Sequence, residues 1–291
     1  MSTSREIKVL HLESTDVCQA ACPLCARETD PAFNKSRQHH LDMYKIMKVF
    51  DADRIAELDK MFMCGNYGDP AAGKYTLNIY REFRKLNKDI VLGMNTNGSI
   101  RTPKYWKTVA ELFNQTFDYV VFSIDGLEDT NHIYRKNVRW SKIIENVQAF
   151  INAGGNAHWD MLVFKHNEHQ IELCRTLSQT VGFKEFTIKH TSRFKEDKLI
   201  TPTHTLQPTQ LSLEMMNKVK LSVNDILPTI KCKAKIDSQL YISANGNVSP
   251  CCWLDLEWQS NASSQDYNDK VGTYPNLNAY SLNEIFDMNH F

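Results

Sequence analysis

The sequence IKVLHLESTDVCQAACPLCARE (residues 7–28) joins a predicted strand to three closely spaced cysteines. Residues 7–14 are rich in apolar and β-branched side chains and predict a β-strand. Cys18, Cys22 and Cys25 follow within one short stretch of chain. Structural zinc sites and [4Fe–4S] clusters usually take four protein ligands. Three thiols without a fourth nearby therefore predict a metal centre with one position open for a substrate or cofactor.

The spacing alone leaves two alternatives open. The three cysteines can be packed side chains of a turn, or they can form a zinc site that His39 or His40 completes. We predict that two of the other cysteines are buried thiols rather than metal ligands. Cys174 lies on an apolar helical stripe, and Cys64 lies at a strand end.

The composition is that of a globular protein of 291 residues with a formal net charge of zero. No excess of basic residues is available to neutralise phosphates, so we expect no nucleic-acid partner. No basic segment followed by a long apolar run opens the sequence, and no apolar run approaches the ~20 residues of a membrane span. We therefore expect a cytoplasmic protein that does not bind membranes, with thiols that are reduced and available for metal binding or redox chemistry.

Strand-like and helix-like segments alternate from the N-terminus to about residue 191. Strands are predicted at residues 7–14, 61–65, 90–96, 119–125, 161–165 and 183–190. Helices are predicted at 76–87, from Pro103, at 141–153 and at 168–181. This α/β pattern predicts a parallel sheet curled into a barrel or partial barrel, whose chemistry lies at the carboxyl ends of the strands. Polar clusters with glycine follow those ends at 65–70, 95–98 and 123–126.

The chain changes character after residue 192. Residues 193–230 contain several prolines and one predicted helix at 209–222, so we interpret them as a bridging segment. From residue 231 a compact segment carries three more cysteines and a hairpin signal at Asn245-Gly246. We expect three parts: a partial barrel at 1–192, the bridge at 193–230 and a C-terminal extension at 231–291.

The segment CQAACPLC (18–25) has the form CxxxCxxC and resembles the radical S-adenosylmethionine (SAM) superfamily. Later segments are similar to family segments near SAM, and each follows a predicted strand: CGNYGDP (64–70), NTNG (95–98), SIDG (123–126) with HIYRK (132–136), and FKHNEHQI (164–171). The resemblance spans roughly residues 7–192 and implies a partial (β/α)6 TIM-like barrel.

The resemblance implies a [4Fe–4S] cluster on Cys18, Cys22 and Cys25, with SAM chelating the open iron. One electron then cleaves SAM, and the resulting 5′-deoxyadenosyl radical abstracts a hydrogen atom from a substrate. An electron donor such as flavodoxin or ferredoxin is the implied partner, and no side chain is assigned as catalytic. Contacts with SAM are implied for Gly65, Asn66, Tyr67, Gly68, Asp69, Asn95, Asn97, Ser123, Asp125, Arg135 and Asn167.

These residues also have structural interpretations. Gly65 and Gly68 can serve tight turns, Ser123 and Asp125 can cap the following helix, and Arg135 can pair with a carboxylate. Asp69 stands where the family usually has glutamate, so its contact with the SAM amino group is the least defined.

The second group of cysteines resembles the start of SPASM and twitch extensions in the same superfamily. Cys232, Gly246 and Cys251 match their CX9–15GX4C pattern, and the resemblance implies one auxiliary iron–sulfur cluster on Cys232 and Cys251, with Cys252 as a third candidate ligand. Two auxiliary clusters are excluded because too few thiols follow. Adjacent side chains of a strand point to opposite faces, so Cys251 and Cys252 can both ligate only if the chain bends at Pro250. The alternative is a degenerate twitch domain without a cluster.

The leading functional hypothesis is a radical SAM enzyme that modifies a peptide or protein. One alternative is a radical SAM dehydrogenase or rearrangement enzyme acting on a small molecule such as an aminosugar. Another, from a different class, is a non-catalytic zinc-binding interaction module.

Overall fold

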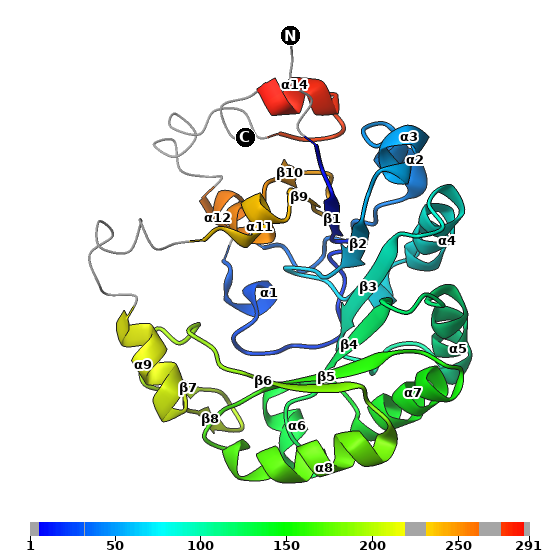
Figure 1. Ribbon diagram of the computed structural model, residues 1–291. Coiled ribbons are helices and arrows are strands. Elements are labelled where there is room, and N and C mark those ends of the chain that lie inside the picture. Colours follow the sequence, from blue (N-terminus) through cyan, green and yellow to red (C-terminus); the bar gives the residue numbers. More distant parts are fainter. Residues whose placement is uncertain (1–5, 32, 219–230, 262–274, 288–291) are drawn as a thin grey trace.

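The computed structural model describes residues 6–31, 33–218, 231–261 and 275–287. Six consecutive parallel strands form most of its main sheet, and Figure 1 shows this sheet curling into an open arc with the larger helices outside it. The strands are β1 (Val9–Leu12), β2 (Lys60–Met63), β3 (Val91–Thr96), β4 (Tyr119–Ser123), β5 (Ala157–Leu162) and β6 (Glu185–Lys189). The expected α/β partial barrel is confirmed.

Helices connect the parallel strands, as right-handed crossovers require. The larger ones are α4 (Thr76–Leu86), α5 (Pro103–Leu112), α6 (Glu128–Tyr134), α7 (Trp140–Asn152) and α8 (Ile171–Val181). Their apolar stripes pack on the sheet: Ile79 and Phe83 of α4 are fully buried in one core with Leu10 and Leu12 of β1. Since side chains alternate along a strand, His11 and Glu13 point to the opposite, inner face of the arc.

The predicted hairpin around Asn245-Gly246 is present and belongs to the main sheet. β9 (Gln239–Ile242) pairs in parallel with β1, and β10 (Val248–Ser249) pairs antiparallel with β9. Gly246 has a φ of +90°, the left-handed conformation that a tight turn needs. The sheet order is therefore β10-β9-β1-β2-β3-β4-β5-β6. The C-terminal segment adds α11 (Lys233–Ile236), α12 (Cys252–Asn261) and α14 (Leu282–Asp287).

Two predicted elements differ from the structure. The strand predicted at 161–165 lies at Ala157–Leu162, because after Leu162 the chain turns and the Asn167 side chain accepts a hydrogen bond from the Phe164 amide (2.7 Å). The helix predicted at 209–222 appears as α9 (Gln210–Lys218), and residues 219–222 lie outside the described residues.

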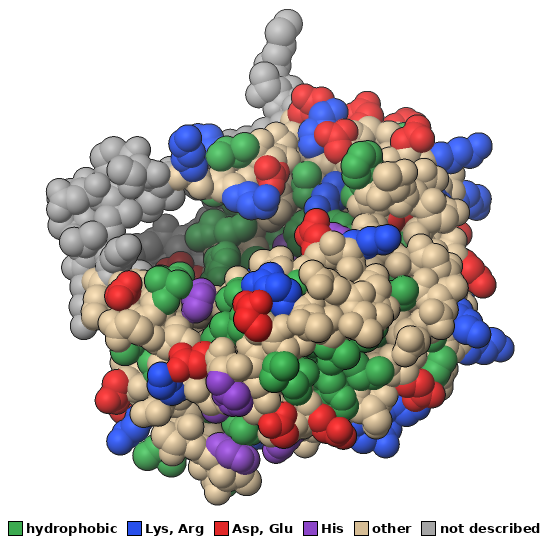
Figure 2. All heavy atoms as spheres, turned by 60° about the horizontal axis from the view of Figure 1, so that its bottom comes forward, with side chains coloured by type: hydrophobic (Ala, Val, Ile, Leu, Met, Phe, Trp, Pro, Cys, Tyr) green, Lys and Arg blue, Asp and Glu red, His purple; other side chains and the backbone are tan. Residues whose placement is uncertain are grey.

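Several short elements were not predicted. They are α1 (Ala26–Thr29), α2 (Met43–Met47), α3 (Ala52–Ala56), the 3-10 turns η1 (Pro70–Ala72) and η2 (Glu168–Gln170), and the pair β7 (Leu199–Ile200) and β8 (Thr205–Leu206). The helices α6, α11 and α12 were not predicted either. Within the described part of the chain, no helix is both long and apolar enough to cross a membrane. On the face shown in Figure 2, acidic and basic side chains are interspersed, in keeping with the balanced composition.

A buried ion pair ties the outer helices to the sheet. The carboxylate of Asp118, just before β4, has no exposed surface and accepts hydrogen bonds from the Leu92 amide (2.8 Å), the Gln115 amide (3.0 Å) and Arg84 Nη2 (2.5 Å). Removing one partner of a buried pair leaves an uncompensated charge and unpaired donors.

We therefore expect Asp118→Ala to lower the free energy of unfolding by about 3–5 kcal/mol. The exposed Asp89, in the turn before β3, offers a matched control, and Asp89→Ala should stay within about 0.5 kcal/mol of wild type. Urea unfolding of the three proteins measures both changes. Equal stability of the two variants would contradict this role for the buried pair.

Candidate functional site

Three thiols line one cavity at the carboxyl ends of the parallel strands. The cavity has a volume of about 520 Å³, and Cys18, Cys22 and Cys25 all contribute to its wall. They lie on the segment between β1 and the short helix α1, and the Cys25 amide donates to the Cys22 carbonyl (2.9 Å) to close the turn. We call this space the thiol cavity.

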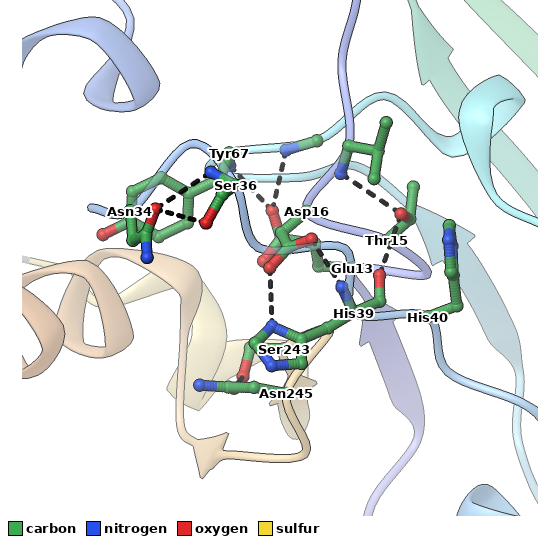
Figure 3. Close-up of polar contacts among 12 residues, drawn as sticks. Glu13, Thr15, Asp16, Asn34, Ser36, His39, His40, Tyr67, Ser243 and Asn245 are labelled. Atoms are coloured by element: carbon green, nitrogen blue, oxygen red, sulfur yellow. Dashed lines mark hydrogen bonds and ion pairs between the residues drawn. The ribbon is translucent and has the colours of Figure 1, made fainter.

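The donor set fits an iron–sulfur cluster. Thiols that hold a [4Fe–4S] cluster bind separate iron corners, so they need to face a shared space rather than one point. Among the described residues, no three Cys, His, Asp or Glu side chains gather closely enough to hold a single metal ion. Neither His39 nor His40 is among the residues that line the thiol cavity, and His39 Nδ1 lies 2.7 Å from the Asp16 carboxylate (Figure 3).

Burial and a nearby cation have opposite effects on the pKa of the Cys22 thiol. Its burial raises the pKa of the thiol to about 11, and the nearby Arg135 guanidinium opposes this rise. Arg135 Nη1 approaches Cys22 Sγ at 4.0 Å. A cation beside this sulfur favours its thiolate form, which is the form that binds metal.

The loop after β2 packs tightly on the segment that leads to Cys18. Gly68 allows this approach, because a Cβ atom at this position would lie 1.8 Å from the Thr15 carbonyl oxygen. The Asp69 amide donates to the Val17 carbonyl (2.9 Å). Gly65, Asn66, Tyr67, Gly68 and Asp69 all line the thiol cavity. We call residues 65–69 the glycine loop.

The carboxylate of Asp69 is held within the protein. It is buried and accepts hydrogen bonds from the Ala71 amide (2.9 Å), the Thr96 hydroxyl (2.9 Å) and the Asn97 amide (2.8 Å). Asn97 Nδ2 also donates to it at 2.6 Å, and Asn97 Oδ1 accepts from Gln19 Nε2 at 2.8 Å. Asp69 and Asn97 therefore fasten the cysteine segment, the glycine loop and the end of β3 to one another.

Arg135 is held in place from behind by a buried carboxylate. Asp125 is fully buried and accepts from Arg135 Nε (2.6 Å) and from the Leu162 amide (2.8 Å). Asn167 Nδ2 donates to the Asp125 and Leu162 carbonyls, both at 3.0 Å. Arg135 lines the thiol cavity, whereas Asp125 and Asn167 are not among its lining residues. The structure thus places those two predicted residues behind the cavity wall.

Of the other predicted SAM contacts, Asn95 and Ser123 also line the cavity. The structure adds wall residues that sequence reasoning missed, among them Lys189, whose ammonium pairs with Asp160 at 2.5 Å. Asp160 lies on β5 and Lys189 on β6. On both strands polar side chains alternate with apolar ones, and this alternation is the sequence signal that could have identified Lys189 as a wall residue. Cys64, predicted as a buried neighbour, lines the cavity as well, and burial raises the pKa of its thiol to about 12.

The C-terminal cysteines are not among the residues that line the thiol cavity, although the Cys252 carbonyl accepts a hydrogen bond from Asn66 Nδ2 of the glycine loop (2.8 Å). Cys232 is exposed and precedes α11, whereas Cys251 and Cys252 follow β10. β10 ends at Ser249 and α12 begins at Cys252, so the chain leaves the strand at Pro250. The strand rule that would send the two adjacent thiols to opposite faces does not apply there.

A second hollow adjoins the thiol cavity. This side groove has a volume of about 650 Å³ and shares Ala26, Arg193, Trp253 and Leu256 with the cavity wall. Its further lining includes apolar residues (Leu24, Phe194, Leu199 and Ile200) and charged residues (Lys195, Glu196 and Lys198). Trp253 is 61% exposed, and the Arg193 guanidinium lies 5.4 Å from the centre of its ring.

Two curated proteins share part of this sequence. The tungsten-containing aldehyde ferredoxin oxidoreductase cofactor-modifying protein of Pyrococcus furiosus is 30% identical over 128 residues, which are 44% of this chain and 33% of that protein. The GTP 3′,8-cyclase of Petrotoga mobilis is 27% identical over 153 residues, 52% of this chain and 45% of that protein. The chain thus matches less than half the length of either relative.

Solved structures share the fold over nearly the whole chain. Streptococcus suis SuiB bound to the precursor peptide SuiA is 13% identical, with a TM-score of 0.66, over 98% of this chain and 65% of that chain. The anSMEcpe structure with bound AdoMet is 14% identical, with a TM-score of 0.61, over 97% of this chain and 81% of that chain. Residues 12–179, more than half of the chain, match the Radical SAM superfamily. The chain, with its CxxxCxxC segment on the wall of a cavity in a partial barrel, belongs to the radical SAM superfamily.

Proposed function

We propose that this enzyme binds a [4Fe–4S] cluster through Cys18, Cys22 and Cys25 and uses it to cleave SAM reductively. The observation that carries the proposal is the shared cavity of the three thiols, walled by the glycine loop, Asn97 and Arg135. When bound, the cluster supplies one electron that breaks SAM into methionine and a 5′-deoxyadenosyl radical, which takes a hydrogen atom from the substrate. We place the reaction in the reducing cytoplasm, with flavodoxin or ferredoxin as the electron donor.

The cavity wall divides its tasks among the predicted residues. Residues 65–68 of the glycine loop, with Asn95, Asn97 and Ser123, bind SAM, and Arg135 stabilises the thiolate of Cys22. Asp69, Asp125 and Asn167 act by holding these groups in position, because hydrogen bonds within the protein already engage their side chains. A site whose polar groups are fixed before binding loses less entropy when the ligand arrives.

The substrate that we propose is a peptide or protein segment. The side groove adds about 650 Å³ beside the thiol cavity. Its lining combines apolar residues with three cations, Arg193, Lys195 and Lys198, and one anion, Glu196. This chemistry fits an extended segment that carries aliphatic and acidic side chains. The solved relatives whose fold this chain shares include SuiB with a precursor peptide. A small molecule such as an aminosugar is the alternative, and it would leave the side groove unused.

An auxiliary cluster on Cys232 and Cys251, with Cys252 as a further ligand, is a separate proposal. β10 runs antiparallel to β9, so the residues before β9 and after β10 lie at the same end of the hairpin. Cys232 belongs to the first set and Cys251 to the second. Such a cluster would accept the electron that the substrate radical loses when it is oxidised, or it would bind the substrate directly.

The primary cluster predicts a specific loss of iron. Anaerobically reconstituted Cys22→Ser protein should hold about four irons per chain fewer than wild type and release no 5′-deoxyadenosine from SAM under a strong reductant. Cys174→Ala is the matched control, because Cys174 is a fully buried thiol of α8, and it should keep the wild-type iron content. A colourless wild-type protein with one zinc per chain would contradict the proposal.

The auxiliary cluster predicts about eight irons per wild-type chain. Cys232→Ala and Cys251→Ala should each lower this number to about four while leaving SAM cleavage measurable. Iron and sulfide analysis of the purified holoproteins gives the counts. About four irons in the wild type, unchanged in both variants, would rule the auxiliary cluster out.

The peptide proposal predicts a preference for acidic peptides. A fluorescein-labelled decapeptide of Glu and Leu should bind the holoenzyme more tightly than its counterpart of Lys and Leu, as measured by fluorescence anisotropy. The double variant Lys195→Glu/Lys198→Glu should reverse this order, since both side chains are exposed in the side groove. Lys104→Glu/Lys107→Glu on α5 makes the same charge change elsewhere and should leave the preference intact. Equal binding of both peptides to every protein would favour the small-molecule alternative.

A further inference from the structure

Glu13 is a buried carboxylate that the proposed chemistry does not yet use. It directly follows β1, only 1% of its surface is exposed, and none of the described Lys, Arg or His side chains forms an ion pair with it. Its burial raises the pKa of the carboxyl group to about 7. Burying a carboxylate without a cation costs free energy unless hydrogen-bond donors compensate for the lost water. The donors to Glu13 therefore show which segments of the protein this side chain holds in place.

Two of these donors are backbone amides of the glycine loop. Glu13 Oε1 accepts hydrogen bonds from the Tyr67 amide at 2.7 Å and from the Gly68 amide at 3.1 Å (Figure 3). The fit is close, because a Cβ atom at Gly65 would lie 2.7 Å from the same oxygen. The loop therefore wraps around this carboxylate, with glycine where a side chain would collide with it.

The third donor comes from the other end of the chain. Tyr241 of β9 is fully buried, and its hydroxyl donates to Glu13 Oε2 at 3.1 Å. β9 lies beside β1 because the two strands pair in parallel, and the Glu13 amide itself donates to the Ile242 carbonyl at 2.8 Å. A second link joins the same two regions, since Asn66 Nδ2 donates to the Cys252 carbonyl at 2.8 Å.

We propose that Glu13 is a positioning residue that holds the glycine loop in its SAM-binding conformation, and that Tyr241 orients Glu13 for this task. The inference rests on the proposed SAM chemistry and adds a role for the C-terminal segment. Through Tyr241, that segment is a structural part of the SAM site and not only a cover for the barrel.

Substitutions at Glu13 separate a hydrogen-bond role from a charge role. Glu13→Gln keeps a carbonyl oxygen for the two loop amides, and its amide can donate to the Tyr241 hydroxyl. Glu13→Ala leaves the two amides without their acceptor. We expect the dissociation constant for SAM to rise about tenfold or more in Glu13→Ala and to stay within about threefold of wild type in Glu13→Gln.

A pair of tyrosine variants tests the link to the C-terminal segment. Tyr241→Phe removes only the hydroxyl that reaches Glu13, and the dissociation constant for SAM should rise about threefold. Tyr80→Phe is the matched control, since the Tyr80 hydroxyl is also buried and donates to the Gly93 carbonyl (2.7 Å), away from the glycine loop. Tyr241→Phe should add nothing in a Glu13→Ala background, because Tyr241 acts through Glu13.

The experiment measures SAM binding by isothermal titration calorimetry on anaerobic holoproteins with equal iron content. Amide hydrogen exchange of residues 65–69 in the metal-free proteins gives a second readout, in which Glu13→Ala should lose protection and Glu13→Gln should keep it. If Glu13→Ala does not fold, the comparison of Tyr241→Phe with Tyr80→Phe decides. Unchanged SAM binding and exchange in Glu13→Ala, or equal effects of the two tyrosine variants, would overturn the inference. A wild-type holoprotein that binds no SAM would instead overturn the proposed function, and this inference with it.

Discussion

The position of β1 between two parallel neighbours is the constraint on which the site depends. β1 pairs with β2 on one side and with β9 on the other, and Leu12 stands opposite both Met63 and Ile242. All three strands therefore end at one level of the sheet. The cysteine segment, the glycine loop and the turn at Gly246 follow these ends, so the crossovers of a parallel sheet bring them together at one edge.

Buried acidic side chains then fix these loops to one another. Glu13, Asp69 and Asp125 are each almost fully buried, and each accepts hydrogen bonds from backbone amides of neighbouring segments. Asp125 adds an ion pair with Arg135, which directs the guanidinium toward Cys22. Moving one of these buried carboxylates away from its hydrogen-bond partners costs free energy, because no water is present to replace them. Hydrogen bonds within the protein therefore organise the cavity wall.

The sequence predicted the alternation of strands and helices and most element positions, because apolar periodicity and turn residues are local signals. The predicted position of β5 was wrong, because the apolar run at 161–165 continues past Leu162, where the strand ends and the chain turns with the help of the Asn167 side chain. The sequence could not separate Arg135, which faces the cavity, from Asp125 and Asn167, which support the wall. Asp125 and Asn167 follow strand ends, whereas Arg135 follows helix α6, and which side of the wall each occupies depends on the packing of neighbouring loops. The absence of a local signal also explains why Glu13 was missed.

The sequence by itself determined the three-thiol pattern, the alternation of strands and helices, and the glycine-containing turns at the strand ends. Only the tertiary structure decided that the hairpin of the C-terminal segment joins the main sheet and that Tyr241 meets Glu13 across 228 positions of sequence. Spacing and periodicity describe neighbours along the chain. A hydrogen bond between residues so far apart arises only when β9 pairs with β1, and that pairing depends on the packing of the whole barrel.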